Sequence, residues 1–192
     1  MFNAQVSFME EITICIRGIR PGSCPTDLSS MFAALGLEVL EIHHGGIRLR
    51  KPFHVKLEVI DHQLRSAKYE WIKDKQGQLV ERVKSLAILM LRNPDFQKSR
   101  LKASHYLSKE LGRSYAHISR VFSKVEGMTI EHYLIEQRIT VAKELLLYEG
   151  CTLVEVSMRL GYSSVQHLSR QFHQITGETV RQYLQESANQ NP

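Results

Sequence analysis

The sequence predicts an α+β domain followed by an all-α domain that holds two tandem helix-turn-helix units joined by a long helix. Strand and helix patterns alternate over residues 12–75, whereas only amphipathic helices occur over residues 76–187. In the helical half, one segment matches another when the chain is shifted by fifty residues, which indicates an internal repeat. Residues 1–11 carry little pattern and are expected to form a flexible lead-in, and residues 188–192 a tail.

The composition indicates a globular protein. Hydrophobic residues make up 43% and charged residues 23% of the 192 residues, which is enough apolar material for two cores. The formal net charge is +5, and Lys and Arg exceed Asp and Glu by 10 − 9 = +1 in residues 1–79 and by 15 − 11 = +4 in residues 80–192. The basic excess lies in the helical half, as contact with phosphates requires, although an ordinary solvated surface could carry it too.

The cysteines and the apolar runs predict a cytoplasmic protein without a membrane partner. Cys15, Cys24 and Cys151 are too few and too scattered for a disulfide framework, so a reducing compartment fits. The longest apolar run, residues 86–91, is far too short to span a bilayer, and the start of the chain has no signal-peptide pattern.

The first half alternates strands with helices. Residues 12–17 alternate apolar and polar side chains, as in a half-buried strand, and turn residues fill 18–25. An apolar stripe then marks a helix from Leu28 to Leu35. The remaining elements are strands over 37–44 and 47–50 joined at Gly45-Gly46, a helix with the stripe Phe53, Leu57, Ile60 and Leu64, and a strand over 69–72. This β-α-β-β-α-β order is that of a ferredoxin-like domain with both helices on one sheet face.

The same half resembles heavy-metal-associated domains over residues 11–74, through its element order and the loop that ends at Cys24. The metal loop of that family needs two cysteines three residues apart, because a soft ion such as Cu(I) prefers paired thiolates. Cys24 matches the second cysteine, but Pro21 stands in place of the first. We therefore expect no metal site and no cofactor, with Cys24 as the remaining candidate ligand.

The second sheet face is expected to be open and partly cationic. Alternation predicts that it carries Thr13, Cys15, Arg17, Glu41, His43, Arg48 and Arg50. Cys15 and the three arginines are the candidate site for an anionic effector or for the acidic edge of a partner. The alternative is an ordinary solvated sheet face.

A helix is predicted between the two halves, over residues 78–93. Leu79, Val83, Leu86 and Met90 follow helical spacing, and Asn93-Pro94 ends the pattern. This helix can be the first of the helical domain, a dimer helix, or both.

The second helix-turn-helix unit begins with Thr152 and Glu155, which have the spacing of a capping box. Gly161 ends this short helix, and Ser163 or Ser164 can cap the next one. In that next helix Leu168, Phe172 and Ile175 form the buried stripe, and Gln166, Arg170 and His173 form the opposite face. A short helix, a tight turn and a helix with a polar and cationic face are typical of a helix-turn-helix with its recognition helix.

An upstream copy matches this unit. The shift of fifty residues aligns His117 with His167, Ser119 with Ser169, Arg120 with Arg170, Phe122 with Phe172, Gly127 with Gly177, Thr129 with Thr179 and Tyr133 with Tyr183. Between the copies, residues 129–148 contain neither proline nor glycine, which predicts a helix of about twenty residues and roughly 30 Å. That length suits two recognition helices in successive major grooves, about 34 Å apart.

Residues 80–186 resemble the DNA-binding domain of AraC/XylS-type bacterial transcription regulators. The runs LGYSS, HLSRQF, TG and QYL, preceded by QRITVAKELL, carry the resemblance. It implies contact with double-stranded DNA at the start of each recognition helix and one turn into it. The candidate DNA-binding residues are Ser114, Ala116, Ser119 and Arg120 in the first copy, and Ser164, Val165, Gln166 and Arg170 in the second. Ala116 and Val165 depart from the family pattern because neither side chain can form a hydrogen bond.

The leading hypothesis is a sequence-specific DNA-binding transcription regulator whose N-terminal domain senses a small-molecule effector or mediates formation of a homodimer. One alternative is a thiol-dependent metal-handling protein in which Cys24 pairs across a dimer. Another is a protein-interaction adaptor with degenerate DNA binding, suggested by Ala116 and Val165. An enzyme is not expected, because the sequence shows no nucleophile with a base, no glycine-rich phosphate loop and no paired carboxylates.

Overall fold

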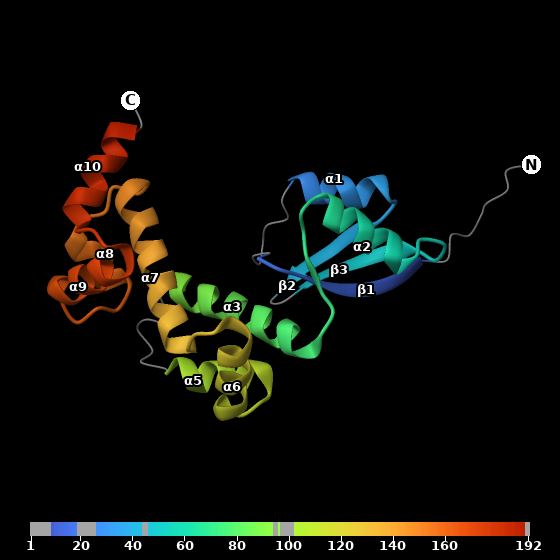
Figure 1. The fold of residues 1–192 in the computed structure, drawn as a ribbon, viewed down its shortest axis with the longest axis horizontal. Coiled ribbons are helices and arrows are strands. Elements are labelled where there is room, and N and C mark those ends of the chain that lie inside the picture. The colour runs from blue at the N-terminus through green and yellow to red at the C-terminus, as the bar shows by residue number, and fades with distance from the viewer. Residues whose placement is uncertain (1–8, 19–25, 44–45, 94–95, 97–101, 191–192) are drawn as a thin grey trace, which may run out of the picture. The chain divides into compact units, whose positions relative to one another are not determined.

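The computed structural model describes residues 9–18, 26–43, 46–93, 96 and 102–190. The chain divides into two compact units, Met1–Leu86 and Ala87–Pro192 (Figure 1). The division falls inside one helix, α3 (Lys75–Arg92), at the place of the helix predicted over residues 78–93. No described helix is both long enough and apolar enough to cross a membrane.

The first unit is a four-stranded antiparallel sheet with two helices. Its elements are β1 (Met9–Ile16), α1 (Thr26–Ala34), β2 (Glu38–His43), β3 (Gly46–Pro52), α2 (Leu57–Ser66) and β4 (Trp71–Ile72), so the order of elements is the predicted one. The strands lie in the order β2-β3-β1-β4, and each pair of neighbours is antiparallel. Both helices cover the same face of the sheet (Figure 1).

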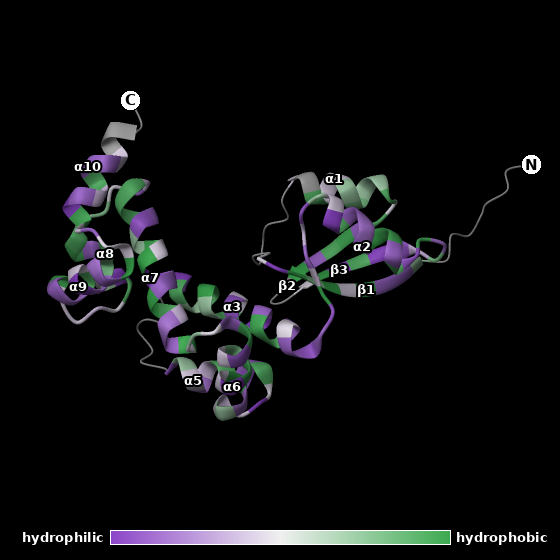
Figure 2. Cartoon of the chain, viewed as in Figure 1, coloured by the Kyte–Doolittle hydropathy of each residue, from purple (hydrophilic) through white to green (hydrophobic). Residues whose placement is uncertain are grey.

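The core of this unit lies between the sheet and the two helices. Ile14 and Ile16 of β1 and Ile47 and Leu49 of β3 are almost completely buried, as the alternation along the strands requires. They pack with Leu28 and Phe32 of α1 and with Ile60 and Leu64 of α2. Much of the central strands is accordingly green in Figure 2, where green marks hydrophobic residues.

Two details of the first unit differ from the sequence prediction. β1 begins at Met9, whose partner in β3 is Pro52, so the lead-in is shorter than residues 1–11. Phe53 is not part of the second helix and is 72% exposed. Because β3 continues to Pro52, Phe53 falls in a turn closed by the bond from Val55 N to Pro52 O (3.0 Å), and Val55 is buried in its place.

The second unit contains the C-terminal end of α3 and six further helices. These are α5 (Ala103–Leu111), α6 (Tyr115–Glu126), α7 (Ile130–Leu147), α8 (Leu153–Arg159), α9 (Val165–Thr176) and α10 (Val180–Gln190). The pairs α5–α6 and α8–α9 are the two helix-turn-helix units, and α7 joins them. At 18 residues, α7 is about 27 Å long.

The internal repeat of the sequence is also present in the side-chain packing. The ring centroids of Phe122 and Tyr133 lie 5.5 Å apart at an interplanar angle of 58°, and those of Phe172 and Tyr183 lie 5.5 Å apart at 60°. The two copies therefore use the same aromatic pair to pack a recognition helix against the helix that follows it.

The predicted caps and stops of the second copy are present. Thr152 and Glu155 form a complete capping box at the start of α8. Gly161 and Gly177 adopt left-handed backbone with φ of 70° and 80°, which ends α8 and α9 in a conformation that glycine takes most readily. The core of this copy joins Val156, Leu160, Leu168 and Phe172 to Ile139, Ala142 and Leu146 of α7.

Candidate nucleic-acid interface

The second recognition helix, α9, presents a polar and cationic face to solvent. Leu168 and Phe172 are fully buried, so the opposite side of the helix, with Gln166 and Arg170, is exposed. Val165, the first residue of the helix, is half-buried. At the N-terminus, the Ser164 hydroxyl accepts a hydrogen bond from the backbone N–H of His167 (3.1 Å). Ser164 is therefore the N-cap of α9, and we expect it to position the helix at the predicted interface.

The first recognition helix, α6, has the same construction. Ile118 and Phe122 are fully buried, which leaves Ala116 and Arg120 exposed and Ser119 half-buried. Ser114 caps the helix through the backbone N–H of His117, at 3.4 Å. All eight predicted residues thus lie at the start of a recognition helix or one turn into it.

The guanidinium groups of the two recognition helices are available to a ligand. Within the described part of the chain, the side chains of Arg120 and Arg170 form no ion pair or hydrogen bond with another residue. An unpaired guanidinium on an exposed helix face offers five donors to base edges or phosphates.

A groove of about 740 Å³ runs beside α9. It is lined by Leu153, Ser169, Arg170, His173, Gln174, Thr179, Val180 and Arg181. Sequence reasoning missed Arg181 as a candidate, although Thr179 and Gln182 have the capping-box spacing that places residue 181 in the first turn of α10. Arg181 is exposed and, like Arg170, forms no ion pair with another described residue.

The first copy differs at the corresponding position, because residue 131 is glutamate. The Tyr115 hydroxyl donates a hydrogen bond to Glu131 Oε1 at 2.5 Å. Burial of the ring and this bond raise the pKa of Tyr115, and the same bond lowers the pKa of the Glu131 carboxyl. Glu131 therefore carries its negative charge at neutral pH.

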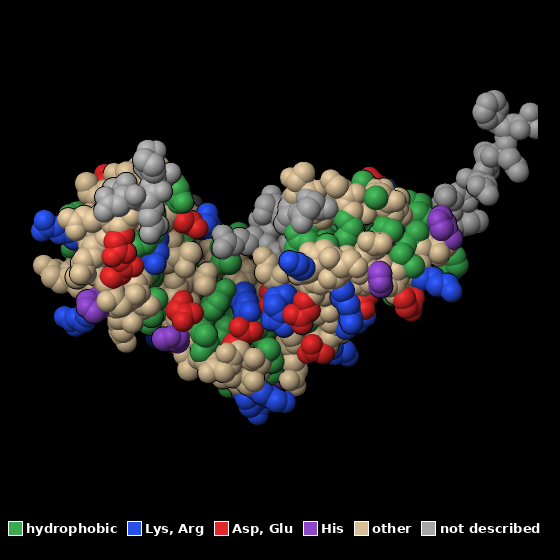
Figure 3. Space-filling view, turned by 45° about the horizontal axis from the view of Figure 1, so that its top comes forward, with side chains coloured by type: hydrophobic (Ala, Val, Ile, Leu, Met, Phe, Trp, Pro, Cys, Tyr) green, Lys and Arg blue, Asp and Glu red, His purple; other side chains and the backbone are tan. Residues whose placement is uncertain are grey.

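The arginines predicted on the open sheet face of the first unit already have carboxylate partners. Arg48 pairs with Glu41 at 2.9 Å, and Arg50 pairs with Glu38 at 2.8 Å and with Glu11 at 3.4 Å. Figure 3 draws another face of the molecule, and basic and acidic side chains lie interspersed there as well. An anionic effector would have to compete with these carboxylates.

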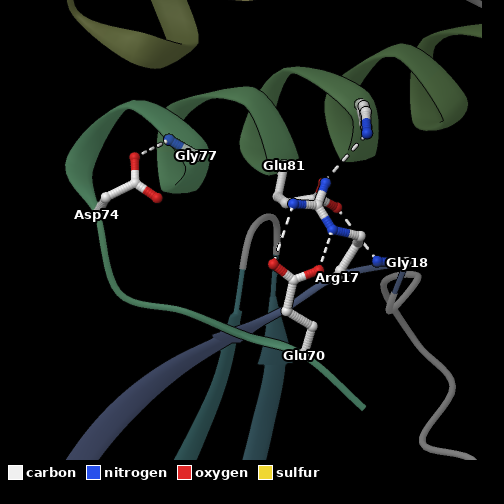
Figure 4. A network of polar contacts seen from close by, with 7 residues as sticks. Arg17, Gly18, Glu70, Asp74, Gly77 and Glu81 are labelled. Atoms are coloured by element: carbon white, nitrogen blue, oxygen red, sulfur yellow. Dashed lines mark hydrogen bonds and ion pairs between the residues drawn. The ribbon is translucent and has the colours of Figure 1, made fainter. Parts of the chain in front are cut away.

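Arg17 belongs to a network at the start of α3 (Figure 4). Its Nε atom lies 2.6 Å from Glu70 Oε2, and its Nη1 atom lies 3.5 Å from Glu81 Oε1. Glu81 also accepts the backbone N–H of Gly18 at 3.2 Å and the Lys84 ammonium at 3.1 Å. The carboxylate of Glu81 is buried, which its position in the sequence did not suggest.

Cys15 does not lie on an open face, so this part of the prediction is wrong. It is 4% exposed, and burial, followed by the nearby Glu81 carboxylate, raises its pKa to about 11. The cause is the first part of α3, which lies close to the end of the sheet formed by β1 and β4. A Cβ atom at Gly77 would lie 2.5 Å from Ile72 Cγ2, so the helix could not approach β4 as closely with a larger residue.

The candidate metal ligand Cys24 and the neighbouring Pro21 lie outside the described residues. Within the described residues, no group of three or more His, Cys, Asp or Glu side chains could hold a metal ion. Cys15 and Cys151 are free thiols. Their environments differ, because Cys151 is only partly buried.

Comparison with known proteins supports the assignment of the helical half. Residues 107–186 match the family model described as a helix-turn-helix domain, a stretch that begins within α5, ends within α10 and includes both recognition helices. No curated protein matches the chain.

Several solved structures are similar to part of the chain. The C-terminal domain of AraT, a response regulator from Geobacillus stearothermophilus, is 24% identical, with 57% of this chain and 86% of that chain covered and a TM-score of 0.48. The DNA-binding domain of AdpA, a global transcriptional factor crystallised in complex with a target DNA, is 22% identical, with 59% and 96% covered and a TM-score of 0.49. The C-terminal domain of the two-component response regulator yesN from Fusobacterium nucleatum is 26% identical, with 52% and 95% covered and a TM-score of 0.43.

Proposed function

We propose that this protein is a sequence-specific transcription regulator that binds double-stranded DNA through α6 and α9. The observation that carries the proposal is the pair of capped recognition helices, each with an unpaired arginine one turn from its start, within a segment that matches a helix-turn-helix family model. An adaptor without DNA binding would have no need for Arg120 and Arg170 at equivalent exposed positions.

The linker helix supports simultaneous binding by both copies. α7 is about 27 Å long, and successive major grooves on one side of B-DNA lie about 34 Å apart. The packing of both copies against this one helix fixes their spacing, so a single chain can occupy two adjacent grooves.

The exposed side chains assign different reading roles to the two helices. Arg120 and Arg170 suit guanine, whose O6 and N7 accept two hydrogen bonds from one guanidinium. Gln166 suits adenine, whereas Ala116 can make only an apolar contact, for example with a thymine methyl group. The second copy therefore reads its half-site with more hydrogen bonds than the first.

Selection of bound fragments from the source genome tests the proposal. We expect enrichment of a site with two half-elements about one helical turn apart, bound with a steep dependence on salt. Arg170→Ala should weaken binding to this site by about 1–3 kcal/mol and relax the choice at one base pair. Arg65→Ala, in the first unit, is the matched control and should leave binding unchanged. If Arg170→Ala weakens binding equally on every DNA sequence, Arg170 does not read a base.

The first unit is proposed to have a ferredoxin-like fold and to serve in self-association or in sensing a small-molecule effector. Its β-α-β-β-α-β order and antiparallel strand pairing support the fold assignment. The carboxylates paired with Arg48 and Arg50 favour self-association over capture of an anion. Sedimentation over a range of concentrations tests this choice, because a monomer at all concentrations would leave effector sensing as the role of the unit.

The proposed regulator acts in the cytoplasm and has no catalytic function. A metal-handling protein remains the alternative that depends on Cys24. Titration of Cu(I) into the intact protein and into Cys24→Ala separates the two, since an identical titration removes the metal-handling alternative.

A further inference from the structure

The internal repeat allows the two DNA-reading units to be compared residue by residue. The shift of fifty residues aligns Arg120 with Arg170, and both copies cap the following helix with a threonine. Along the groove beside the recognition helix, however, Glu131 takes the place of Arg181. This reversal of charge at one position of an otherwise matched surface should change the electrostatic interaction of that surface with DNA.

In the second copy, two arginines from different helices line the same groove. Arg170 comes from α9 and Arg181 from the first turn of α10, and both line the same concave surface with His173 and Ser169. Neither arginine forms an ion pair with another described residue. Arginine binds phosphate through parallel hydrogen bonds, and a second guanidinium nearby strengthens the attraction to the same anion.

In the first copy, a carboxylate occupies the corresponding position and is held there. Tyr115 is the first residue of α6 and donates its hydroxyl to Glu131 at 2.5 Å. The residue aligned with Tyr115 is Val165, which cannot make such a bond. The exposed charge of Glu131 thus has a fixed position beside the recognition helix, where it repels the DNA backbone.

We propose that the two copies hold DNA unequally. The groove of the second copy binds a backbone phosphate through Arg181 beside Arg170, whereas Glu131, held by Tyr115, keeps a phosphate away from the equivalent place in the first copy. This inference rests on the proposed function, because the surfaces concerned are those of the two recognition helices.

The salt dependence of DNA binding tests the phosphate site. Loss of one phosphate contact reduces the slope of log Kd against log salt by about 0.9, so the loss of affinity between about 50 and about 200 mM salt becomes about 3.5-fold smaller. We expect Arg181→Gln to show this change on the selected site and equally on unrelated DNA. Arg170→Gln should differ, because it should also reduce the discrimination between the two DNAs.

The first copy supplies the reciprocal test. Glu131→Arg should add a phosphate contact and steepen the slope by about 0.9. Glu131→Gln, which keeps an oxygen that can accept from the Tyr115 hydroxyl, should tighten binding at low salt and have a smaller effect at high salt. Circular dichroism of each variant before titration establishes that it is folded, and Glu131→Gln remains informative if Glu131→Arg does not fold.

The outcomes separate this inference from the proposed function. Specific binding by the wild-type protein, with an unchanged slope for Arg181→Gln and unchanged binding by Glu131→Gln, would overturn the inference and leave the regulator intact. Binding without sequence preference would remove the regulator, while the slopes of the variants would still decide the phosphate site. A folded wild-type protein that does not bind DNA would overturn both.

Discussion

Replacement of Glu81 by alanine should destabilise the first unit far more than replacement of Glu70, although both carboxylates contact Arg17. The bond from Arg17 to Glu70 is the shorter one, 2.6 Å against 3.5 Å. The side chain of Glu70 is 60% exposed, however, whereas that of Glu81 is 6% exposed. Burial rather than bond length should determine how far the free energy of unfolding falls, because water can replace a missing partner at the surface.

The expected magnitudes follow from these environments. Breaking a buried ion pair costs about 3–5 kcal/mol. The cations that face Glu81 are partly exposed, 44% for Arg17 and 18% for Lys84, so hydration offsets part of the loss and we expect about 2–3 kcal/mol. Glu81→Ala also removes the acceptor of the Gly18 N–H. For Glu70→Ala we expect about 0–1 kcal/mol, as for other exposed pairs.

Urea unfolding followed by tryptophan fluorescence measures this difference. Trp71 is the single tryptophan of the sequence and lies in β4, where it pairs with Ile16, so its emission reports on the unit that contains the network. We expect a lower midpoint for Glu81→Ala with an unchanged m-value, and nearly the wild-type midpoint for Glu70→Ala. A loss for Glu70→Ala as large as that for Glu81→Ala would refute the argument from burial.

Two further predictions follow from the packing of the core and the burial of a thiol. Phe172→Ala and Phe122→Ala should each cost about 3–5 kcal/mol in thermal melts, since both rings are fully buried, and clearly unequal losses would show that the copies pack differently. In a Cys24→Ser background, iodoacetamide should modify Cys15 more slowly than Cys151 at pH 8, because the thiolate is the reactive form. The reaction of Cys15 should accelerate toward its pKa of about 11, and equal rates at pH 8 would contradict its burial. Since the unfolded thiol ionises near pH 9.0, the stability contributed by Cys15 should fall as the pH rises from there to about 11.

The helical half was predictable because its signals are local. The capping box of Thr152 and Glu155 and the buried pair Leu168 and Phe172 all involve residues three or four positions apart, so sequence spacing alone determines which side chains meet. The repeat adds a second copy of the buried pair, in Ile118 and Phe122. Prediction of the two recognition helices therefore required no knowledge of long-range contacts.

The contacts that sequence reasoning missed join distant parts of the chain. Arg17 and Glu81 are 64 positions apart, and no periodic pattern links them. The burial of Cys15 depends on the position of α3, which the alternation of β1 cannot indicate. Arg181 was missed for another reason: it lies outside the recognition helix and lines the groove beside α9 only because α10 starts there.

The differences between the two copies bear on the kind of DNA site that the chain can recognise. Positions that pack the repeat are the same or similar, such as Phe122 with Phe172, because both copies must fill the same space. Exposed positions diverge, as in Ala116 against Gln166, because packing does not constrain them. The two copies follow one another in a single chain, so they are not related by the two-fold symmetry of a dimer of identical reading heads. In the proposed regulator, unlike side chains in a fixed order would read unlike half-elements in a fixed order, and we therefore expect a site read by one chain to have a direction along the DNA.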